Sequence, residues 1–349
     1  MKLKNKFHRI INWEYWPSSM LYIPNIPYAL FLALKARHFS FFTATNPSIK
    51  SSGNGTESKY KTIQLIPEVY RPKSILVNPN NTFKEVKNEI DRKNISYPII
   101  VKPDIGFRGL LVKKINSDLD LKEYLSKYKI DIIIQEFIDY EKECGIFYHR
   151  RPDATEGKIT SITLKKFLSV TGNGISTLKE LIYDDNRTKL YIDIINNNPE
   201  YDLNIIPKKN EIINLSVIGN HCKGTQFING NHLINDSLRF TFDKINKSIN
   251  GWYYGRLDIK YNTFEELEKG ENLKILEING VIAEPTHIYD SKTYSYIEAL
   301  KEIRSHWKSL YKIAKVNHEK FKVPYKRTQK VTKEILHLKN YITNIKSLS

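Results

Sequence analysis

Residues 274–280 read Lys-Ile-Leu-Glu-Ile-Asn-Gly, and this short stretch decides how the fold of the chain is interpreted. Its isoleucine and leucine residues predict a buried strand, yet Glu277 and Asn279 interrupt the apolar run. Side chains two positions apart in an extended chain leave the same face of a sheet. We therefore expect Glu277 and Asn279 to point together at a polar group.

The stretch 253–261, YYGRLDIKY, has the same mixed character. Strand alternation places Arg256 and Asp258 on one face, with leucine and isoleucine on the other. A buried strand keeps such charges only where they are paired or bind a ligand. On neighbouring strands, Asp258, Glu277 and Asn279 would supply three oxygen ligands of the kind that Mg²⁺ prefers. The alternative is a structural salt bridge between Arg256 and Asp258, with Asn279 capping a turn.

A phosphate-binding segment is predicted at residues 97–109, YPIIVKPDIGFRG. Lys102 stands at the end of a strand, and a lysine acts on phosphate as a point charge. Gly106 and Gly109 allow the following loop to bring backbone N–H groups close to anionic oxygens. Residues 110–115, LLVKKI, are expected to form the paired strand.

The charge of the 349-residue chain lies mainly at its two ends. Residues 1–50 carry seven Lys and Arg against one Glu, and residues 301–349 carry thirteen against three, so the ends supply +6 and +10 of the formal +17. This distribution predicts attraction to an anionic surface such as membrane headgroups or nucleic acid. The alternative is that these lysines only solvate helix faces. The 40% hydrophobic content predicts a folded protein of two or three domains.

No secretion signal or membrane span is expected at the N-terminus. The basic start MKLKNKFHR is followed by Glu14 and Pro17, where an apolar signal segment would run. Residues 20–34, MLYIPNIPYALFLAL, contain two prolines and fall short of the roughly 20 residues that a spanning helix needs. Cys144 and Cys222 have no metal-ligand spacing, and they predict a reducing, cytoplasmic compartment.

The aromatic residues near the N-terminus allow two interpretations. Trp13, Tyr15 and Trp16 beside Lys and Arg could lie in a bilayer interface. The favoured interpretation is that they pack on the body of the protein. The loop SIKSSGNGTESK, residues 48–59, lacks phosphate-loop spacing and is expected at the surface, although Ser58 and Lys59 could approach a ligand.

Strands interleave with helices, which places the chain in the α/β or α+β class. Further strands are expected within residues 129–138 and 158–170. Thr177 stands three residues before Glu180, a capping-box spacing that predicts the start of a helix. Beyond about Ser291 the periodicity is helical, with a break at Pro324 before a basic terminal helix.

Residues 96–305 resemble the ATP-grasp superfamily of nucleotide-dependent ligases, which includes D-alanine–D-alanine ligase and cyanophycin synthetase. Five segments appear in the family's order. They are YPIIVKPDIGFRG, IIIQEFIDYEKE, VTGNGISTLKELI, GRLDIK and LEING. The resemblance implies an α+β ATP-grasp fold that grips ATP between two α/β subdomains, preceded by an N-terminal α/β region (1–95) and followed by a basic helical tail (306–349).

The resemblance also implies roles for individual residues. The adenine would lie against Glu136, Phe137 and Ile138, and Glu143 would reach the ribose hydroxyls. Two Mg²⁺ ions would be bound by Asp258, Glu277 and Asn279, with Lys102 and Arg256 offsetting charge on the transferred phosphoryl group. A closing loop is expected at residues 218–227, where Lys223 and Asn220 could touch phosphate and His221 is a further candidate. Only one of Lys165 and Lys166 can face the nucleotide, because neighbours on a strand point in opposite directions.

The chain departs from D-alanine–D-alanine ligases after the second metal strand. Those enzymes continue into a proline-glycine loop, whereas residues 280–290 read GVIAEPTHIYD. Glu284 and His287 are therefore expected near the acceptor, where a carboxylate could hold an amino group and a histidine could accept its proton. The alternative is that Glu284 pairs with a lysine and His287 is a structural loop residue. A dipeptide product is disfavoured.

The sequence therefore predicts a cytoplasmic ATP- and Mg²⁺-dependent ligase, with association with the inner face of the membrane as an open alternative. It would activate a small-molecule or polymer-end carboxylate as an acyl phosphate and join it to an amine. One alternative is an ATP-grasp kinase for a small molecule. The other is a basic membrane- or nucleic-acid-binding protein with an inactive nucleotide site, which the intact site residues disfavour; nucleic acid is not expected as a partner.

Overall fold

The computed structural model describes residues 9–106, 109–196, 201–216 and 219–347. Most of the basic start of the chain and part of two predicted loops, at 107–108 and 217–218, lie outside these residues. Helices and antiparallel sheets together confirm the predicted α+β class. The predicted capping box of Thr177 and Glu180 is present at the start of α7.

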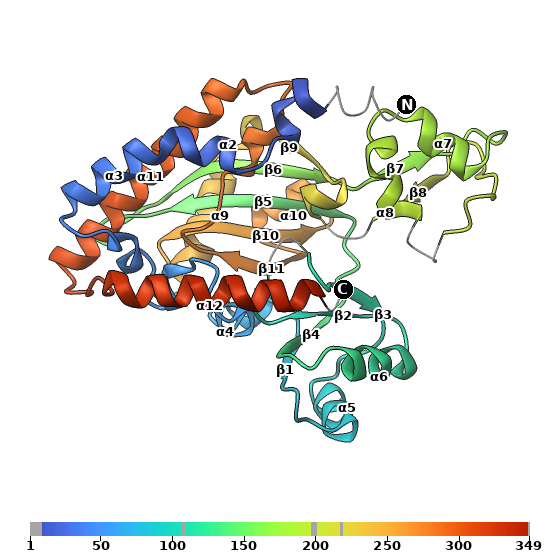
Figure 1. The fold of residues 1–349 in the computed structure, drawn as a ribbon, viewed down its shortest axis with the longest axis horizontal. Helices are drawn as coiled ribbons and strands as arrows, with labels where there is room; N and C mark the ends of the chain where they lie inside the picture. The colour runs from blue at the N-terminus through green and yellow to red at the C-terminus, as the bar shows by residue number, and fades with distance from the viewer. Residues whose placement is uncertain (1–8, 107–108, 197–200, 217–218, 348–349) are drawn as a thin grey trace.

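The centre of the molecule is a five-stranded antiparallel sheet (Figure 1). Its strands, in spatial order, are β11 (Leu273–Asn279), β10 (Tyr254–Tyr261), β5 (Lys142–His149), β6 (Lys158–Lys166) and β9 (Gln226–Asn229). Side chains alternate along each strand, so one face is apolar. Leu257 and Ile259 of β10 join Cys144 and Ile146 of β5 in this core. Helices α9 (Asp236–Lys247) and α10 (Phe264–Lys269) cover that face.

A β-bulge interrupts the pairing of β10 with β11. Asp258 pairs with Glu277, but the next residue, Ile259, pairs with Ile275, so Leu276 has no partner of its own. One extra residue in a strand reverses which face of the sheet the following side chains point to. Ile275 therefore points into the apolar core, while Glu277, two positions later, belongs to the opposite face.

A second sheet of four antiparallel strands lies below the first in Figure 1. Its order is β1 (Ser74–Val77), β4 (Ile132–Glu136), β2 (Ile99–Pro103) and β3 (Lys113–Ile115). Helices α5 (Phe83–Arg92) and α6 (Asp118–Lys127) pack on it around buried isoleucines. The pairing of β2 with β3 confirms the paired strands expected around Lys102. Before this sheet lie α4 (Lys59–Ile63) and the 3₁₀ turn η5 (Glu68–Tyr70).

A small unit projects to the right in Figure 1. It contains the two-stranded ribbon of β7 (Ser169–Thr171) and β8 (Ile212–Asn214), with α7 (Leu178–Asp184), η6 (Thr188–Tyr191) and α8 (Ile192–Asn196). It has its own apolar cluster, against which Tyr15 packs. The chain returns to the large sheet through η7 (His221–Lys223), and η8 (Asn231–Leu233) follows β9.

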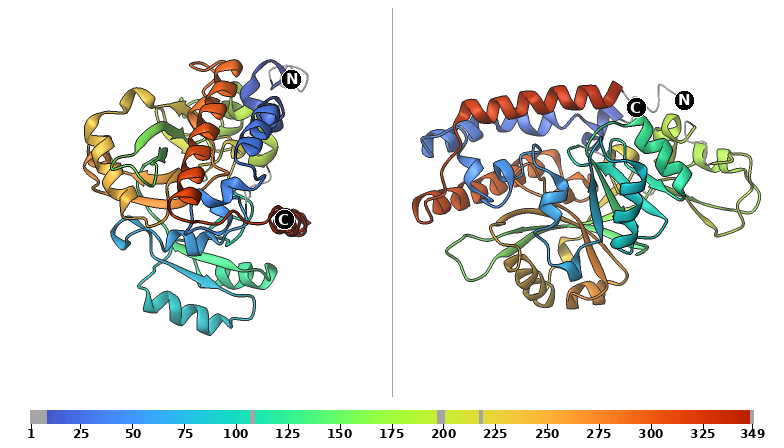
Figure 2. Two further views of the ribbon diagram at one scale, coloured as in Figure 1. Left: turned by 90° about the vertical axis from the view of Figure 1, so that its left-hand side faces the viewer. Right: turned by 90° about the horizontal axis from the view of Figure 1, so that it is seen from below.

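Helices from the two ends of the chain cover the other side of the large sheet (Figure 2, left). The N-terminal elements are η1 (Trp13–Tyr15), α2 (Ser19–Tyr22), η2 (Ile23–Asn25), α3 (Ile26–Lys35), η3 (Phe41–Ala44) and η4 (Lys50–Ser52). They pack with α11 (Tyr296–Glu319) against Phe147 and Tyr254 of the sheet. The long helix α12 (Thr328–Ser347) lies outermost, and η9 (Thr286–Tyr289) precedes α11.

The N-terminal aromatic residues pack on the protein's own body. The Trp13 ring stacks on Tyr289 with centroids 6.0 Å apart, and Trp16 meets Tyr296 edge-on at 5.4 Å. The favoured interpretation of the sequence, that the N-terminal aromatic residues pack on the body of the protein, is therefore confirmed. None of the helices in the described ranges combines the length and apolar composition that a bilayer crossing needs.

Two glycines allow the loop before α4 to cross the end of β11. Val281 N donates to Ser52 O at 3.0 Å, and Ile282 N donates to Gly53 O at 3.1 Å. A Cβ on Gly280 would lie 2.2 Å from Ser52 O and 2.7 Å from Gly53 Cα, both of which are backbone atoms. The crossing therefore leaves no room for a side chain.

We expect Gly280→Ala to lower the free energy of unfolding by about 1–3 kcal/mol, because backbone atoms must move apart. Denaturant unfolding measures this change. Gly106→Ala is the matched control, since its nearest neighbour would be Pro103 Cβ at an ordinary 3.5 Å. Equal stabilities of the two variants would contradict the close crossing.

Candidate active site

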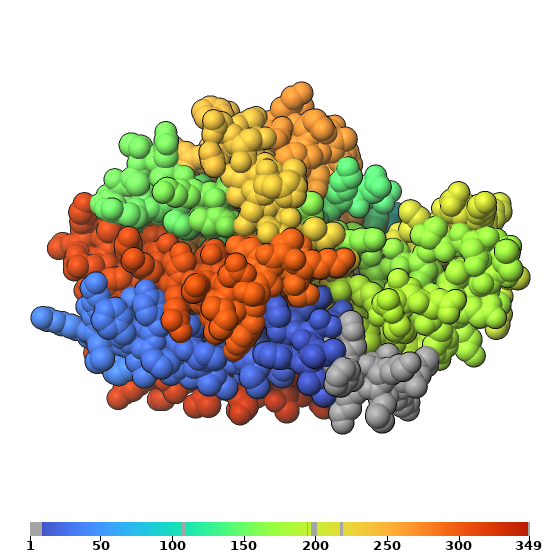
Figure 3. All heavy atoms as spheres, turned by 90° about the horizontal axis from the view of Figure 1, so that it is seen from above, coloured from blue at the N-terminus to red at the C-terminus, as the bar shows by residue number. Residues whose placement is uncertain are grey.

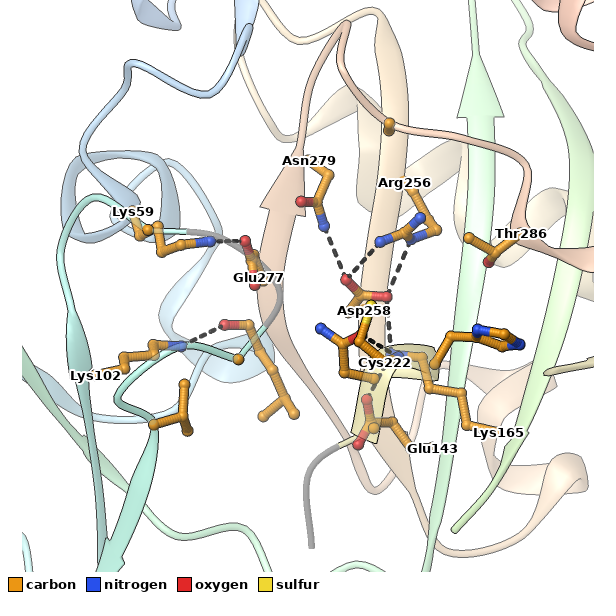
Figure 4. A pocket seen from close by; sticks show the side chains of 18 of the residues that line it. Lys59, Lys102, Glu143, Lys165, Cys222, Arg256, Asp258, Glu277, Asn279 and Thr286 are labelled. Carbon is orange, nitrogen blue, oxygen red and sulfur yellow. Dashed lines mark hydrogen bonds and ion pairs between the residues drawn. The ribbon is translucent and has the colours of Figure 1, made fainter. Parts of the chain in front are cut away.

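A cavity of about 710 Å³ lies between the two larger sheets, and Figure 4 shows its polar side chains. The four-stranded sheet contributes Lys102 and Gln135, and the five-stranded sheet contributes Glu143, Asp258 and Glu277. The face opposite the apolar core is therefore polar at the point where the two sheets meet. Asp258, Glu277 and Asn279 line the same cavity, as strand alternation predicted.

Asp258 is the most heavily paired carboxylate of the cavity. Arg256 donates from Nε to Oδ1 at 3.1 Å and from Nη2 to Oδ2 at 3.2 Å. Lys165 Nζ lies 3.1 Å from Oδ1, and Asn279 Nδ2 donates to Oδ2 at 2.8 Å. Burial alone would raise the pKa of Asp258, but the two cations outweigh it and hold this pKa well below its usual range. Asp258 is therefore an anion at any physiological pH.

Lys165, rather than Lys166, is the lysine of β6 that faces the cavity. Its Nζ donates to Glu143 Oε1 at 2.6 Å as well as to Asp258. The loop after residue 218 lies directly over this pair, since a Cβ on Gly219 would come within 2.4 Å of Glu143 Oε1. Asn220, His221 and Cys222 of that loop also line the cavity.

Glu277 forms an ion pair with Lys59, which comes from the first turn of α4 (Figure 4). Burial would lower the pKa of Lys59, but the carboxylates of Glu277, Glu57 and Asp258 together raise it above its usual value. From the sequence, Lys59 was expected in a surface loop that could approach a ligand, and not among the site residues. The two residues are 218 positions apart, and the crossing at Gly280 brings them together.

Lys102 lies beside the carboxylates of the cavity but is not paired with one in the described part of the chain. Its Nζ lies 3.1 Å from Gln135 Oε1 and 3.5 Å from the carbonyl oxygen of Leu276, the bulged residue. Within the described ranges it forms no ion pair, whereas Lys59 and Lys165 both do. Burial lowers its pKa to about 8. Gly106 and Gly109 line the cavity beside it, as expected.

One part of the cavity wall is apolar. Ile100, Val112, Ile138 and Leu276 line it together with Phe137. Lys114 Nζ lies 4.2 Å and Lys260 Nζ 5.3 Å from the centroid of the Phe137 ring. Such a wall suits a planar heterocycle. Glu136 also lines it, but its carboxylate accepts a hydrogen bond from the backbone N–H of Lys73 at 2.8 Å.

Another part of the cavity wall contains Glu284. Tyr22 donates a hydrogen bond to Oε1 of Glu284, and Tyr289 donates to Oε2 at 2.8 Å. The described part of the chain offers Glu284 no ion-pair partner, so the predicted pairing with a lysine is absent there. The N-terminal segment forms this wall, since Glu14, Trp16, Ser18 and Tyr22 all line the cavity.

Glu14 connects the N-terminal segment to the loop over the cavity. Its Oε1 lies 2.8 Å from Arg187 Nη1 and 2.9 Å from His221 Nε2. Burial would raise the pKa of Glu14, but His221 and Arg187 together lower it. No signal in the sequence pointed to Glu14 or Tyr22, because each acts on residues more than 170 positions away.

Two predicted site residues are not brought to the cavity. His287 is fully buried, its Nδ1 lies 2.7 Å from Ser161 Oγ, and burial lowers its pKa to about 4. Its neighbour Thr286 lines the cavity instead. Lys223 stands at the end of η7 but is not among the lining residues, although Asn220 and His221 are.

The side-chain oxygen atoms of Asp258, Glu277 and Asn279 fit a hard divalent cation. In the described ranges, no three His, Cys, Asp or Glu side chains are grouped as a metal site. The predicted set instead combines two carboxylates with one carboxamide, and the oxygen of Asn279 lies toward Glu277 in Figure 4. A set of carboxylate and carbonyl oxygens without sulfur or imidazole suits Mg²⁺, which keeps part of its water shell.

Comparisons with known proteins find similarity to one domain family. Residues 56–148 match the sequence profile of the RimK-like ATP-grasp domain. Over 90 residues the chain is 33% identical to coenzyme gamma-F420-2:alpha-L-glutamate ligase from Methanococcus maripaludis. The aligned segment covers 25% of this chain and 30% of that protein. The resemblance to the ATP-grasp superfamily is thereby confirmed.

Solved structures of similar shape include two ligases. VanG D-Ala:D-Ser ligase from Enterococcus faecalis has a TM-score of 0.43 and 13% identity, with 75% of this chain and 64% of that chain covered. D-alanine–D-alanine ligase from Bacillus anthracis has a TM-score of 0.40 and 13% identity, with 74% and 68% covered.

Lys102→Met is expected to stabilise the folded protein at neutral pH. The pKa of Lys102 in the folded state, about 8, lies below the usual 10.5, so its charged form disfavours folding below pH 8. This disadvantage disappears as the pH rises from about 8 toward 10.5. Thermal unfolding as a function of pH measures the effect.

The control for this experiment is Lys84→Met, which removes an exposed lysine. The stability gain should be confined to Lys102→Met and should shrink above pH 8. A loss of stability at neutral pH would show that Lys102 is a structural cation rather than one held for an anionic ligand.

Proposed function

We propose that this chain, which contains a RimK-like ATP-grasp domain, is an ATP- and Mg²⁺-dependent ligase that activates a carboxylate and joins it to an amine. The observation that carries the proposal is Lys102, which has no carboxylate partner among the described residues and lies beside a set of hard oxygen ligands. An ammonium group without an ion-pair partner can bind an anionic ligand, such as the phosphates of ATP.

Nucleotide binding would use both sheets. The apolar wall around Phe137 and Ile138 would take the adenine, and the loop of Gly106 and Gly109 would cover the phosphates next to Lys102. Asp258, Glu277 and Asn279 would hold two Mg²⁺ ions, which would neutralise the phosphate charge. Glu143 would reach the ribose.

The chain's own residues would then position the reacting groups. A carboxylate oxygen of the substrate attacks the γ-phosphorus of ATP, the bond to ADP breaks, and an acyl phosphate forms. Arg256 and Lys102 would offset the charge on the transferred group, which phosphoryl transfer needs more than covalent help. The amine loses one proton to solvent, its nitrogen attacks the carbonyl carbon, the bond from that carbon to the phosphate oxygen breaks, and a second proton leaves the nitrogen with the departing phosphate.

Glu284 would bind the amine. The two tyrosine hydroxyls orient its carboxylate, which forms no ion pair within the described chain and interacts with Arg256 only at longer range. A charge of this kind at the wall of a cavity attracts a protonated amine. His287 is left out of this role, because it is fully buried and bound to Ser161.

Peripheral contact with an anionic membrane stays a separate proposal. The aromatic residues that suggested it in the sequence are packed against Tyr289 and Tyr296. Any membrane-binding surface must therefore be formed by other residues.

Asp258→Asn should lower ADP release by about a hundredfold or more, because one charge contact to a transferring phosphoryl group is worth about 3 kcal/mol of barrier. A coupled ADP assay, with pairs of carboxylates and amines as substrates, measures the turnover. Calorimetry of ATP binding with and without Mg²⁺ gives a second readout. The control is Asp236→Asn, an exposed residue on α9.

Two outcomes of these measurements would contradict the proposal. Equal Mg²⁺-dependent ATP binding by the wild type and Asp258→Asn would overturn the metal assignment. ADP release with a single substrate, and without free phosphate, would replace the ligase by a kinase. The ligase requires both substrates before ADP and phosphate accumulate together.

Glu284→Gln is expected to raise KM for the amine about tenfold or more, since a charged hydrogen bond is worth about 1.5–3 kcal/mol. The affinity for Mg·ATP should change less, because Arg256 contacts the backbone carbonyl oxygen of Glu284, which the substitution keeps. Tyr22→Phe and Tyr289→Phe, which keep the carboxylate but remove one hydrogen bond each, should give smaller effects. An unchanged KM in Glu284→Gln would exclude this residue from amine binding.

A further inference from the structure

The helical segment α2–η2–α3 exposes an unusual amount of apolar surface. From Ser18 to Leu34 the chain contains no charged side chain. Six large apolar side chains of this segment are between 45% and 69% exposed. They follow one another at helical spacing, and we call them the apolar face: Met20, Ile23, Ile26, Leu30, Phe31 and Leu34.

Single exposed apolar side chains are normal, but a continuous face of six marks a contact with something else. The opposite side of the same segment packs against the rest of the protein. Leu21, Asn25 and Leu32 are buried, and Asn25 Nδ2 donates to the backbone of Leu21 at 2.9 Å. The apolar face is therefore the side that the protein's own packing leaves over.

A row of cations lies along the neighbouring helix α11. Its members recur at intervals of three and four residues and are all exposed, and we call them the basic row: Lys301, Arg304, Lys308, Lys312 and Lys315. Lys315 is 3.7 Å from Glu319. The other four have no ion-pair partner within the described chain.

The apolar face and the basic row lie on neighbouring elements. Figure 3 looks onto this side of the molecule, where the blue N-terminal segment lies beside the orange helix α11. Arg304 Nε donates to Asn25 Oδ1 at 2.5 Å, and Lys35 Nζ lies 5.7 Å from the ring of Tyr311. These contacts fix the two helices side by side along their length.

We propose that this surface docks the protein on an anionic lipid bilayer. The apolar face would enter the region between headgroups and acyl chains, and the basic row would contact lipid phosphates. Both features are those of proteins that lie in the plane of a membrane interface. A second copy of the chain fits less well, because a symmetric contact would bring two basic rows together.

The test is co-sedimentation of the full chain with lipid vesicles. Vesicles of equal parts phosphatidylcholine and phosphatidylglycerol should bind the protein, and vesicles of phosphatidylcholine alone should bind it much more weakly. Lys301→Gln, Lys308→Gln and Lys312→Gln combined should reduce binding at least about tenfold, because each lysine near such a surface is worth about 1 kcal/mol. High salt should act in the same direction.

The apolar face is tested by Leu30→Glu combined with Leu34→Glu. Both side chains are about half exposed or more, so the fold should survive, and circular dichroism checks it. The matched control is Leu119→Glu with Ile175→Glu, which are 77% and 80% exposed on other parts of the molecule. The control for the lysines is Lys84→Gln, Lys93→Gln and Lys179→Gln.

Vesicle binding lost in both test variants and kept in both controls supports the proposal. Equal binding by a test variant and its control would overturn it. So would a wild-type dimer in light scattering that Leu30→Glu with Leu34→Glu dissociates, since the face would then be an interface between copies. The measurement does not depend on ADP release, so it stands or falls separately from the ligase.

Discussion

The bulge at Leu276 is the constraint on which the candidate active site depends. Without it, Ile275 and Glu277 would share one face of β11, and the sheet could not have both an apolar core and a polar cavity at this point. The extra residue turns Ile275 into the core and Glu277 toward Asp258. It also leaves the carbonyl oxygen of Leu276 close to Lys102. Bulges near functional sites commonly redirect a side chain in this way.

Charge balance follows from that arrangement. Asp258, Glu277 and Glu143 face the cavity together, and such a group of carboxylates repels itself unless cations are present. Lys165, Arg256 and Lys59 provide them, each from a different element. Lys102 is left over from this pairing, and for that reason burial can lower its pKa to about 8. The three cations thus match the three carboxylates, and Lys102 adds a positive charge where phosphate would bind.

Local pattern was enough to predict much of this site. The spacing of Arg256 and Asp258, and of Glu277 and Asn279, predicted one shared face, and these side chains do line one cavity. The bulge was not predicted, although adjacent Ile275 and Leu276 followed by Ile278 already break the alternation of a regular strand. That break was the available signal.

Long-range contacts could not be predicted in the same way. Lys59 reaches Glu277 only because two glycines let the chain cross closely, and glycine spacing says nothing about a crossing partner. His287 was expected at the acceptor because it follows Glu284 closely in the sequence. The tight turn of η9 directs it into the core instead, and Tyr289, two residues further, reaches the Glu284 carboxylate.

The N-terminal segment connects the two proposals in space. Tyr22 donates to Glu284 at the acceptor end of the cavity, while Met20 and Ile23, its close neighbours in the chain, belong to the apolar face. One short helical turn therefore has one side in the cavity and the other toward solvent. A bilayer on the apolar face would lie nearer to the amine end of the cavity than to the wall proposed for adenine. This arrangement suits an amine or carboxylate substrate carried by a lipid or a membrane-bound polymer, while ATP enters from the aqueous side.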